Sequence, residues 1–90
     1  MGVEAISKNE KAKQRLLAMP RDYTYAEARA LLGQLGFQED NKGKTSGSRV
    51  KFYRATDKKA IMLHKPHPGD IVSIGNVKDL VEFLKGLGEL

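Results

Sequence analysis

Residues 47–69 read GSRVKFYRATDKKAIMLHKPHPG, and this stretch decides the fold. Its first part, residues 48–54, alternates apolar and polar side chains, with Val50 and Phe52 on one face of a predicted strand. A short polar run follows, and residues 60–64 return as a second apolar strand. The stretch therefore predicts an antiparallel hairpin with one apolar face.

The other face of this hairpin is expected to be polar. Successive side chains of a strand point to opposite faces, so Ile61 and Leu63 on the return strand alternate with Met62 and His64. The predicted polar face carries Arg49, Lys51, Tyr53 and, if the two strands pair in this register, His64.

After the hairpin, the sequence predicts a stiff turn, a short extended piece and a final helix. The two prolines of residues 66–69 cannot donate to a strand ladder, so they form a turn that holds His67 between them. Residues 70–74 add a short extended segment. Asn76 is the predicted N-cap of a helix over residues 77–86.

Two helices are predicted before the hairpin. The first covers residues 8–18, and the second covers residues 25–35. Thr24 and Glu27 have the spacing of a capping box at the start of the second helix. Gly36 is the expected left-handed residue at its C-terminal end.

The remaining segment connects the second helix to the hairpin. Residues 37–38 are expected to begin a short edge strand, and residues 39–47 are polar and glycine-bearing, as is typical of a flexible loop. The order helix, helix, two or three antiparallel strands, helix predicts a small α+β domain with its helices on one face of the sheet.

Composition excludes several classes of protein. Ninety residues make one domain with a small core. The chain has no cysteine, which excludes a disulfide framework, a thiolate zinc site and a thiol nucleophile. No apolar run approaches the roughly 20 residues of a membrane span, and the N-terminal residues do not resemble a signal peptide. We therefore expect a cytoplasmic protein without a membrane partner.

Positive charge is concentrated in one third of the chain. Residues 42–67 hold eight of the sixteen Lys and Arg residues and one of the eleven acids, a formal charge of +7, whereas the rest of the chain is −2. A local basic surface favours a polyanionic partner, and an aromatic side chain within it favours unpaired RNA bases. The residues expected to bind RNA are Lys42, Lys44, Ser48, Arg49, Lys51, Tyr53, Arg54 and Lys65.

Other kinds of site have weaker support in the sequence. The two histidines have only Asp70 nearby to complete a metal site. Ser48 lacks the Gly-x-Ser-x-Gly elbow of an acyl-transfer nucleophile, and residues 43–45 lack the preceding glycine spacing of a phosphate loop. No metal or other cofactor is therefore expected.

Three segments and the closing helix together resemble the HicA toxins of bacterial toxin–antitoxin pairs. The segments are YAEARALLGQLGF (residues 25–37), GSRVKFY (47–53) and IMLHKPHPG (61–69). The resemblance covers roughly residues 23–90, so residues 1–22 are expected to be a tail and an added helix. It implies a fold like that of double-stranded-RNA-binding domains, cleavage of mRNA, and neutralisation by a HicB-type antitoxin.

The sequence departs from this family at one important position. The family pattern reads Gly-Ser-His at the strand start, and its histidine is credited with catalysis, but this chain has Arg49 there. The second histidine of the pattern is matched by His67, and His64 lies nearby.

Two interpretations of this departure remain open. In the first, His64 or His67 takes the proton from the RNA 2′-hydroxyl, and Arg49 stabilises the charge that develops on the phosphate. In the second, both histidines are ordinary surface residues, and the chain is a non-catalytic RNA-binding module on the same fold.

Overall fold

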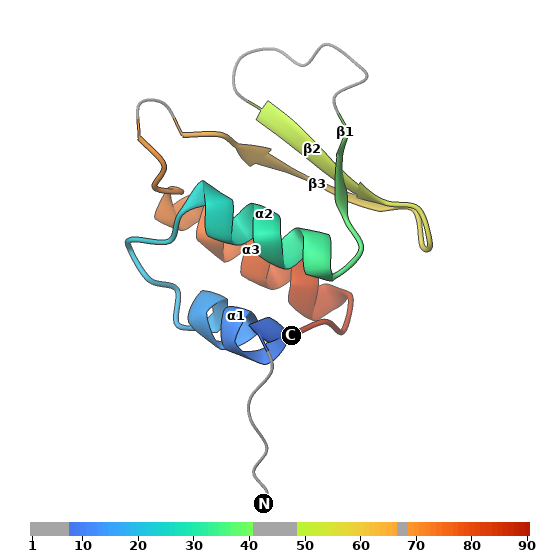
Figure 1. Ribbon diagram of the computed structural model, residues 1–90, viewed down its shortest axis with the longest axis horizontal. Coiled ribbons are helices and arrows are strands. Elements are labelled where there is room, and N and C mark those ends of the chain that lie inside the picture. Colours follow the sequence, from blue (N-terminus) through green and yellow to red (C-terminus); the bar gives the residue numbers. More distant parts are fainter. Residues whose placement is uncertain (1–7, 41–48, 67–68) are drawn as a thin grey trace, which may run out of the picture.

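A three-stranded antiparallel sheet and three helices make up the fold in a computed structural model, which describes residues 8–40, 49–66 and 69–90 (Figure 1). The elements in chain order are α1 (Lys8–Leu17), α2 (Tyr25–Gln34), β1 (Gln38–Asp40), β2 (Arg49–Arg54), β3 (Lys59–His64) and α3 (Ile74–Gly86). The predicted α+β class is confirmed, with the three-stranded form of the sheet and with helices on one face.

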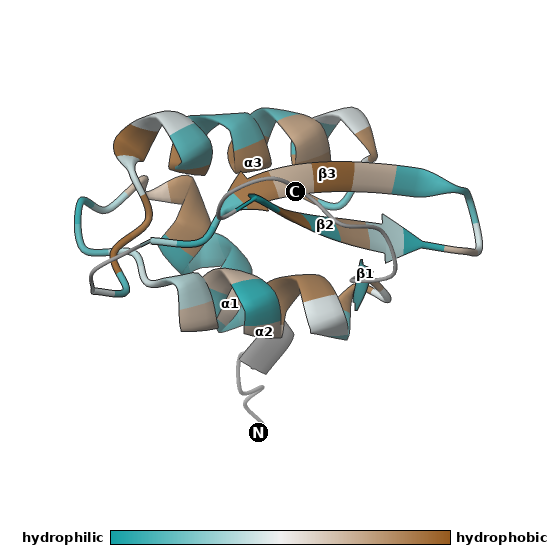
Figure 2. Ribbon diagram, turned by 90° about the horizontal axis from the view of Figure 1, so that it is seen from above, coloured by the Kyte–Doolittle hydropathy of each residue, from teal (hydrophilic) through white to brown (hydrophobic). Residues whose placement is uncertain are grey.

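The sheet has the order β1-β2-β3, and both strand pairs are antiparallel. Phe52 and Leu63 point from the sheet toward the helices, and each is about 1% exposed. In Figure 2, the apolar parts of α3 and β3 lie alongside each other, as expected for a helix that covers a sheet face. The core therefore lies between the sheet and the α2–α3 layer, and it is formed by these buried side chains: Leu16, Tyr23, Tyr25, Ala28, Leu31, Leu32, Phe37, Phe52, Leu63, Val72, Val77, Leu80, Val81 and Leu84.

Both predicted ends of α2 are confirmed. At its start, the Thr24 hydroxyl accepts the Glu27 N–H, and the Glu27 carboxylate accepts the Thr24 N–H at 2.9 Å. At its end, Gly36 has a φ of 96° and donates to the Gly33 carbonyl, while Phe37 donates to the Leu32 carbonyl. These two bonds form a Schellman motif, which turns the chain from α2 into β1.

The predicted start of the last helix is wrong by three residues. Ser73 is the N-cap of α3, since its backbone is extended and its side chain accepts the Asn76 N–H. Asn76 therefore lies inside the first turn, where its own side chain can reach another element. The extended piece predicted before this helix is reduced to one bridge, between Thr24 and Ile71.

The first helix is joined to the same core. Leu16 of α1 is fully buried within the cluster that holds the sheet to α2 and α3, and Figure 1 shows α1 on the side of α2 and α3 that faces away from the sheet. The Arg15 guanidinium pairs with the carboxylate of Glu27, and this hydrogen bond lowers the pKa of Glu27. No helix among the described residues is long and apolar enough to span a membrane.

Candidate nucleic-acid interface

One face of the sheet is not covered by helices, and we call it the open face. The register of the three strands decides which residues belong to it, because directly paired residues share a face. Lys51 pairs with Asp40 on β1 and with Met62 on β3, and Tyr53 pairs with Gln38 on β1 and with Ala60 on β3. The open face therefore carries Gln38, Asp40, Arg49, Lys51, Tyr53, Ala60, Met62 and His64.

Arg49 and His64 lie directly opposite each other on neighbouring strands. The His64 N–H points away from β2 and donates to the Asn76 side chain at 2.9 Å. The two residues thus form a non-hydrogen-bonded pair, the kind in which side chains lie closest, with Cβ atoms about 4.5–5.5 Å apart. The expectation that His64 shares the polar face with Arg49 is confirmed, and the register brings a cation and an imidazole together on an exposed surface.

Asn76 fixes the end of β3 against α3. Its backbone N–H donates to the Ser73 side chain at 3.3 Å, while its side-chain oxygen accepts from His64. A chain of two hydrogen bonds therefore connects the N-cap of α3 to the backbone of the histidine. This arrangement anchors the backbone of His64 to the first turn of α3.

Lys51 and Tyr53 lie side by side along β2. The Lys51 ammonium is 5.8 Å from the centre of the Tyr53 ring, and both side chains are partly exposed. An exposed aromatic ring beside an ammonium offers a surface for stacking a base and a charge for the neighbouring phosphate. The positions of Lys51 and Tyr53 on the open face are therefore consistent with the RNA binding predicted for them.

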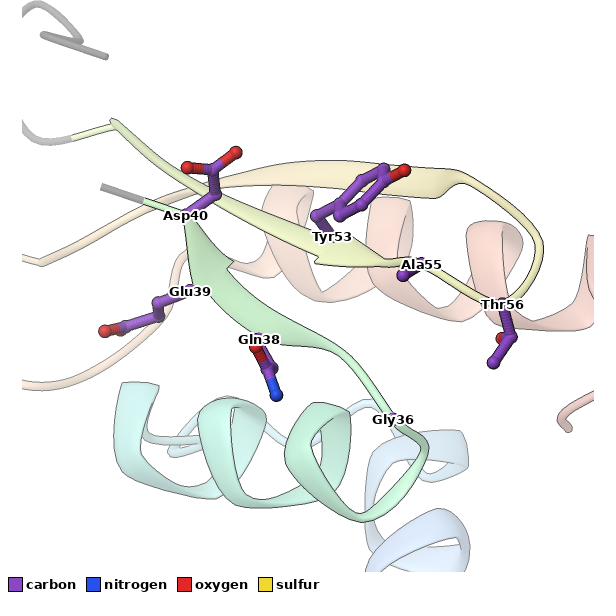
Figure 3. Close-up of a pocket in the computed structure, with 7 residues that line it drawn as sticks. All are labelled: Gly36, Gln38, Glu39, Asp40, Tyr53, Ala55 and Thr56. Carbon is purple, nitrogen blue, oxygen red and sulfur yellow. The ribbon is translucent and has the colours of Figure 1, made fainter. Parts of the chain in front are cut away.

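A hollow of about 380 Å³ lies at the Tyr53 end of the open face. Figure 3 shows Tyr53 and Asp40 rising from the same side of the sheet, with Gly36 and Thr56 at the rim. Its size is at the lower end of the roughly 300–1,000 Å³ range of small-molecule sites.

Glu39 also lines this hollow, but it holds β1 to α2. Its carboxylate accepts the Tyr25 hydroxyl at 2.8 Å and pairs with Arg29 at 3.5 Å. Burial of the Tyr25 ring, together with this hydrogen bond, raises the pKa of Tyr25. These contacts give Glu39 a structural role, because they connect β1 to α2.

Arg54 lies on the opposite face from the other predicted RNA-binding residues of β2. Its side chain is 11% exposed, and its guanidinium donates to Asp57, to Glu89 and to the Leu35 carbonyl at the end of α2. It also lies 4.7 Å from the centre of the Phe37 ring. The structure therefore gives Arg54 a place in the scaffold and does not bring it to the open face.

The other predicted residues are not all placed on the open face. Lys65 follows β3, and its ammonium lies 5.9 Å from the centre of the Tyr25 ring. Four predicted site residues lie outside the described part of the chain: Lys42, Lys44, Ser48 and His67. Within the described ranges, the structure brings together Arg49, Lys51, Tyr53 and His64.

Several residues of this region, among them Met62, Asp40 and Asn76, were not predicted as site residues. Met62 was placed on the polar face by the alternation of β3, and it is 44% exposed. Asp40 lies in the polar, glycine-bearing segment of residues 39–47 that predicts a loop, but it belongs to β1, so this part of the loop prediction is wrong. Asn76 was interpreted as a cap. Among the described residues, no group of three or more His, Cys, Asp or Glu could hold a metal ion.

Comparison with known proteins identifies the family. The family model described as HicA toxin of bacterial toxin–antitoxin matches residues 25–88, which is more than half of the chain and includes the whole sheet and α3. Helix α1 lies before the matched range. The curated proteins and the solved structures give no significant match. The chain therefore belongs to the HicA toxin family of bacterial toxin–antitoxin systems.

Proposed function

We propose that this protein binds mRNA on the open face of its sheet and cleaves it without a metal ion. It acts in the cytoplasm, and a HicB-type antitoxin neutralises it. The observation that carries the proposal is the cross-strand pair of Arg49 and His64, which supplies a base and a cation at one exposed site.

The proposed reaction uses the 2′-hydroxyl of RNA as the nucleophile. His64 takes the proton of this hydroxyl, and the oxygen attacks the adjacent phosphorus to form the 2′,3′-cyclic phosphate. The bond from phosphorus to the 5′-oxygen of the next nucleotide breaks, and this oxygen takes a proton from water. The Arg49 guanidinium stabilises the charge on the phosphorane through hydrogen bonds to its oxygens. His67, which matches the second histidine of the family pattern, is the other candidate for the base.

Arginine at position 49 also supports a second function. The family histidine credited with catalysis is absent there, while arginine retains the ability to bind phosphate. The chain would then be an RNA-binding module that does not cut.

Incubation of the purified protein with mRNA in EDTA distinguishes the two functions. A metal-independent ribonuclease yields fragments that end in 2′,3′-cyclic phosphate, and a 2′-deoxy residue at the cut position blocks the reaction. RNA that stays intact at a large excess of folded protein supports the binding module. His64→Ala and His67→Ala, measured separately with thermal melts as controls, identify the base through a roughly 10²–10⁴-fold loss of rate.

Binding itself is tested by its dependence on salt. Contacts with three or four phosphates predict a slope of about −2 to −3 in a plot of log K against log salt for single-stranded RNA. A slope near zero would remove the argument for phosphate contacts.

The proposed antitoxin is tested by purification of the complex. We expect a small neighbouring gene to encode a protein that co-purifies with this chain and prevents RNA binding. Failure of any such neighbour to bind would count against the toxin function.

A further inference from the structure

We propose that the outer edge of β3 is a docking site for an extended segment of a protein partner, which adds to the sheet as a further strand. The segment has acidic residues at its ends and apolar residues between them. This inference rests on the proposed function, because the expected partner is the antitoxin, and it names the surface that the antitoxin binds. It is carried by the backbone of β3, by a difference between the two edges of the sheet, and by charge.

The register of the sheet determines which backbone groups of β3 point outward. His64 forms a non-hydrogen-bonded pair with β2, so Ile61 and Leu63 are the residues that exchange hydrogen bonds with that strand. The N–H and C=O groups of Ala60 and Met62 therefore point away from β2, toward a side where no described strand pairs with β3. Both residues are exposed. An extended peptide adds to a sheet through an edge of this kind.

The two outer edges of the sheet differ in what they offer to a partner. On β1, the same register makes Gln38 and Asp40 the hydrogen-bonded partners of β2, so only Glu39 has outward backbone groups. On β3, the outward N–H of His64 is already bound by the Asn76 side chain. The site on β3 therefore ends at Asn76 and extends from there toward the β2–β3 turn.

The side chains along β3 define the chemistry of the added segment. Residues 58–66 contain three lysines and no acid. Lys59 is exposed at the start of the strand, and Lys65, whose ammonium lies near the Tyr25 ring, is exposed just after its end. Met62, between them, is 44% exposed. Opposite charges and apolar pairs across neighbouring strands are stabilising, so acidic ends and an apolar centre complement this edge.

A second copy of this chain fits the same edge less well. Antiparallel pairing that places Met62 of one copy opposite Met62 of the other also brings Lys59 opposite Lys65 at both ends. Like charges directly opposite each other destabilise a sheet. Charge therefore assigns the edge to an acidic segment.

A strand at this edge also explains how the antitoxin stops cleavage. The side chain opposite Met62 lies on the open face and is diagonal to His64, at about 7–8 Å, which is within reach of a long side chain. The added strand thus covers the approach of RNA to His64.

The test measures amide hydrogen exchange by NMR, in the free protein and in its complex with the co-purified product of the neighbouring gene. In the free protein, the amides of Ala60 and Met62 should exchange roughly tenfold or more faster than those of Ile61 and Leu63, which are bonded to β2. In the complex, the amides of Ala60 and Met62 should be slowed by roughly tenfold or more.

A pair of variants separates the backbone contribution from that of the side chain. Met62→Pro removes the outward N–H without loss of a bond to β2, whereas Met62→Thr changes the side chain and keeps the N–H. Met62→Pro should weaken the complex by roughly tenfold, and Met62→Thr by less than about threefold. Thermal melts show whether both are folded, and if Met62→Pro is not, the exchange measurement on the parent protein decides.

A synthetic peptide tests the edge without the antitoxin. Its core alternates valine and threonine and is flanked by glutamates, and a matched control peptide is flanked by lysines. The glutamate peptide should bind roughly tenfold more tightly than the control and should protect the same two amides. Equal affinity of the two peptides, or no binding of either, overturns the inference.

The remaining outcomes distinguish this inference from the proposed function. A neighbouring protein that binds but leaves Ala60 and Met62 unprotected overturns the edge site and leaves the toxin–antitoxin function intact. Protection of these amides by RNA alone, or by a concentration-dependent dimer of this chain, assigns the edge to another occupant and also overturns the inference. A neighbouring protein that does not bind contradicts the proposed antitoxin, and the peptides then decide the edge.

Discussion

Arg54→Met removes two ion pairs and a hydrogen bond, which connect β2 to the β2–β3 turn and to the ends of α2 and α3. The Arg54 guanidinium donates to Asp57 at 2.7 and 3.0 Å, to Glu89 at 2.9 Å and to the Leu35 carbonyl at 3.0 Å. Methionine retains an apolar stem against Phe37 but leaves two carboxylates and a helix-end carbonyl without this donor.

The expected cost follows from the burial of these groups. Loss of one partner from a fully buried ion pair costs about 3–5 kcal/mol. The side chains of Asp57 and Glu89 are 35% and 27% exposed, so that water partly replaces the lost donor. We therefore expect Arg54→Met to lower the free energy of unfolding by about 2–3 kcal/mol, which corresponds to a fall in Tm of roughly 10–20 °C for a domain of this size.

The assay is thermal unfolding by circular dichroism, with RNA affinity measured on the same samples. Arg21→Met is the matched control, because it makes the same chemical change at an exposed position in the turn before α2 and should change stability by no more than about 0.5 kcal/mol. If Arg54→Met has the same Tm as the parent protein but binds RNA tenfold more weakly, then Arg54 contacts RNA, and the structural role assigned to it is wrong.

Three further predictions concern stability. Gly36→Ala should cost about 1–3 kcal/mol because its φ is 96°, whereas Gly33→Ala inside α2 should raise Tm; equal effects in thermal melts would contradict this. The Arg15 hydrogen bond holds the pKa of Glu27 below its ordinary value of 4.5, so stability that is present at neutral pH should be lost as the pH falls below this ordinary value. Glu27→Gln should show a flatter decline in thermal melts over the same acid range. The Tyr23 hydroxyl is buried without a hydrogen-bond partner among the described residues, so Tyr23→Phe should keep or raise Tm, and a large fall would show that the hydroxyl is bound.

The sequence predicted most of the fold because its local signals agree with the tertiary structure. The capping box at Thr24 and Glu27, and the alternation in residues 49–54 and 59–64, each depend on neighbours in the chain. The predicted start of α3 is wrong because Ser73 and Asn76 are both good N-cap residues. The choice between them depends on the sheet, since the Asn76 side chain binds the backbone of His64 in β3 and Ser73 caps the helix.

The candidate site was predicted less completely than the fold. Alternation predicts Arg49, Lys51 and Tyr53 on one face, and the observed register adds His64 to that face, directly opposite Arg49. Charge alone could not show that Arg54 lies on the other face, since its partner Glu89 is 35 residues away. Such long-range pairs leave no periodic signal in a sequence.

The most direct test of the proposed mechanism is a double-mutant cycle on the cleavage rate, with Arg49→Ala, His64→Ala and the double variant. If the pair acts on one step, each single variant should lose roughly 10²–10⁴-fold in rate, and the double variant should lose little more than the slower single variant. Thermal melts confirm that all three are folded. Single variants that cut RNA at the parental rate, or losses that multiply in the double variant, would contradict a shared site at Arg49 and His64.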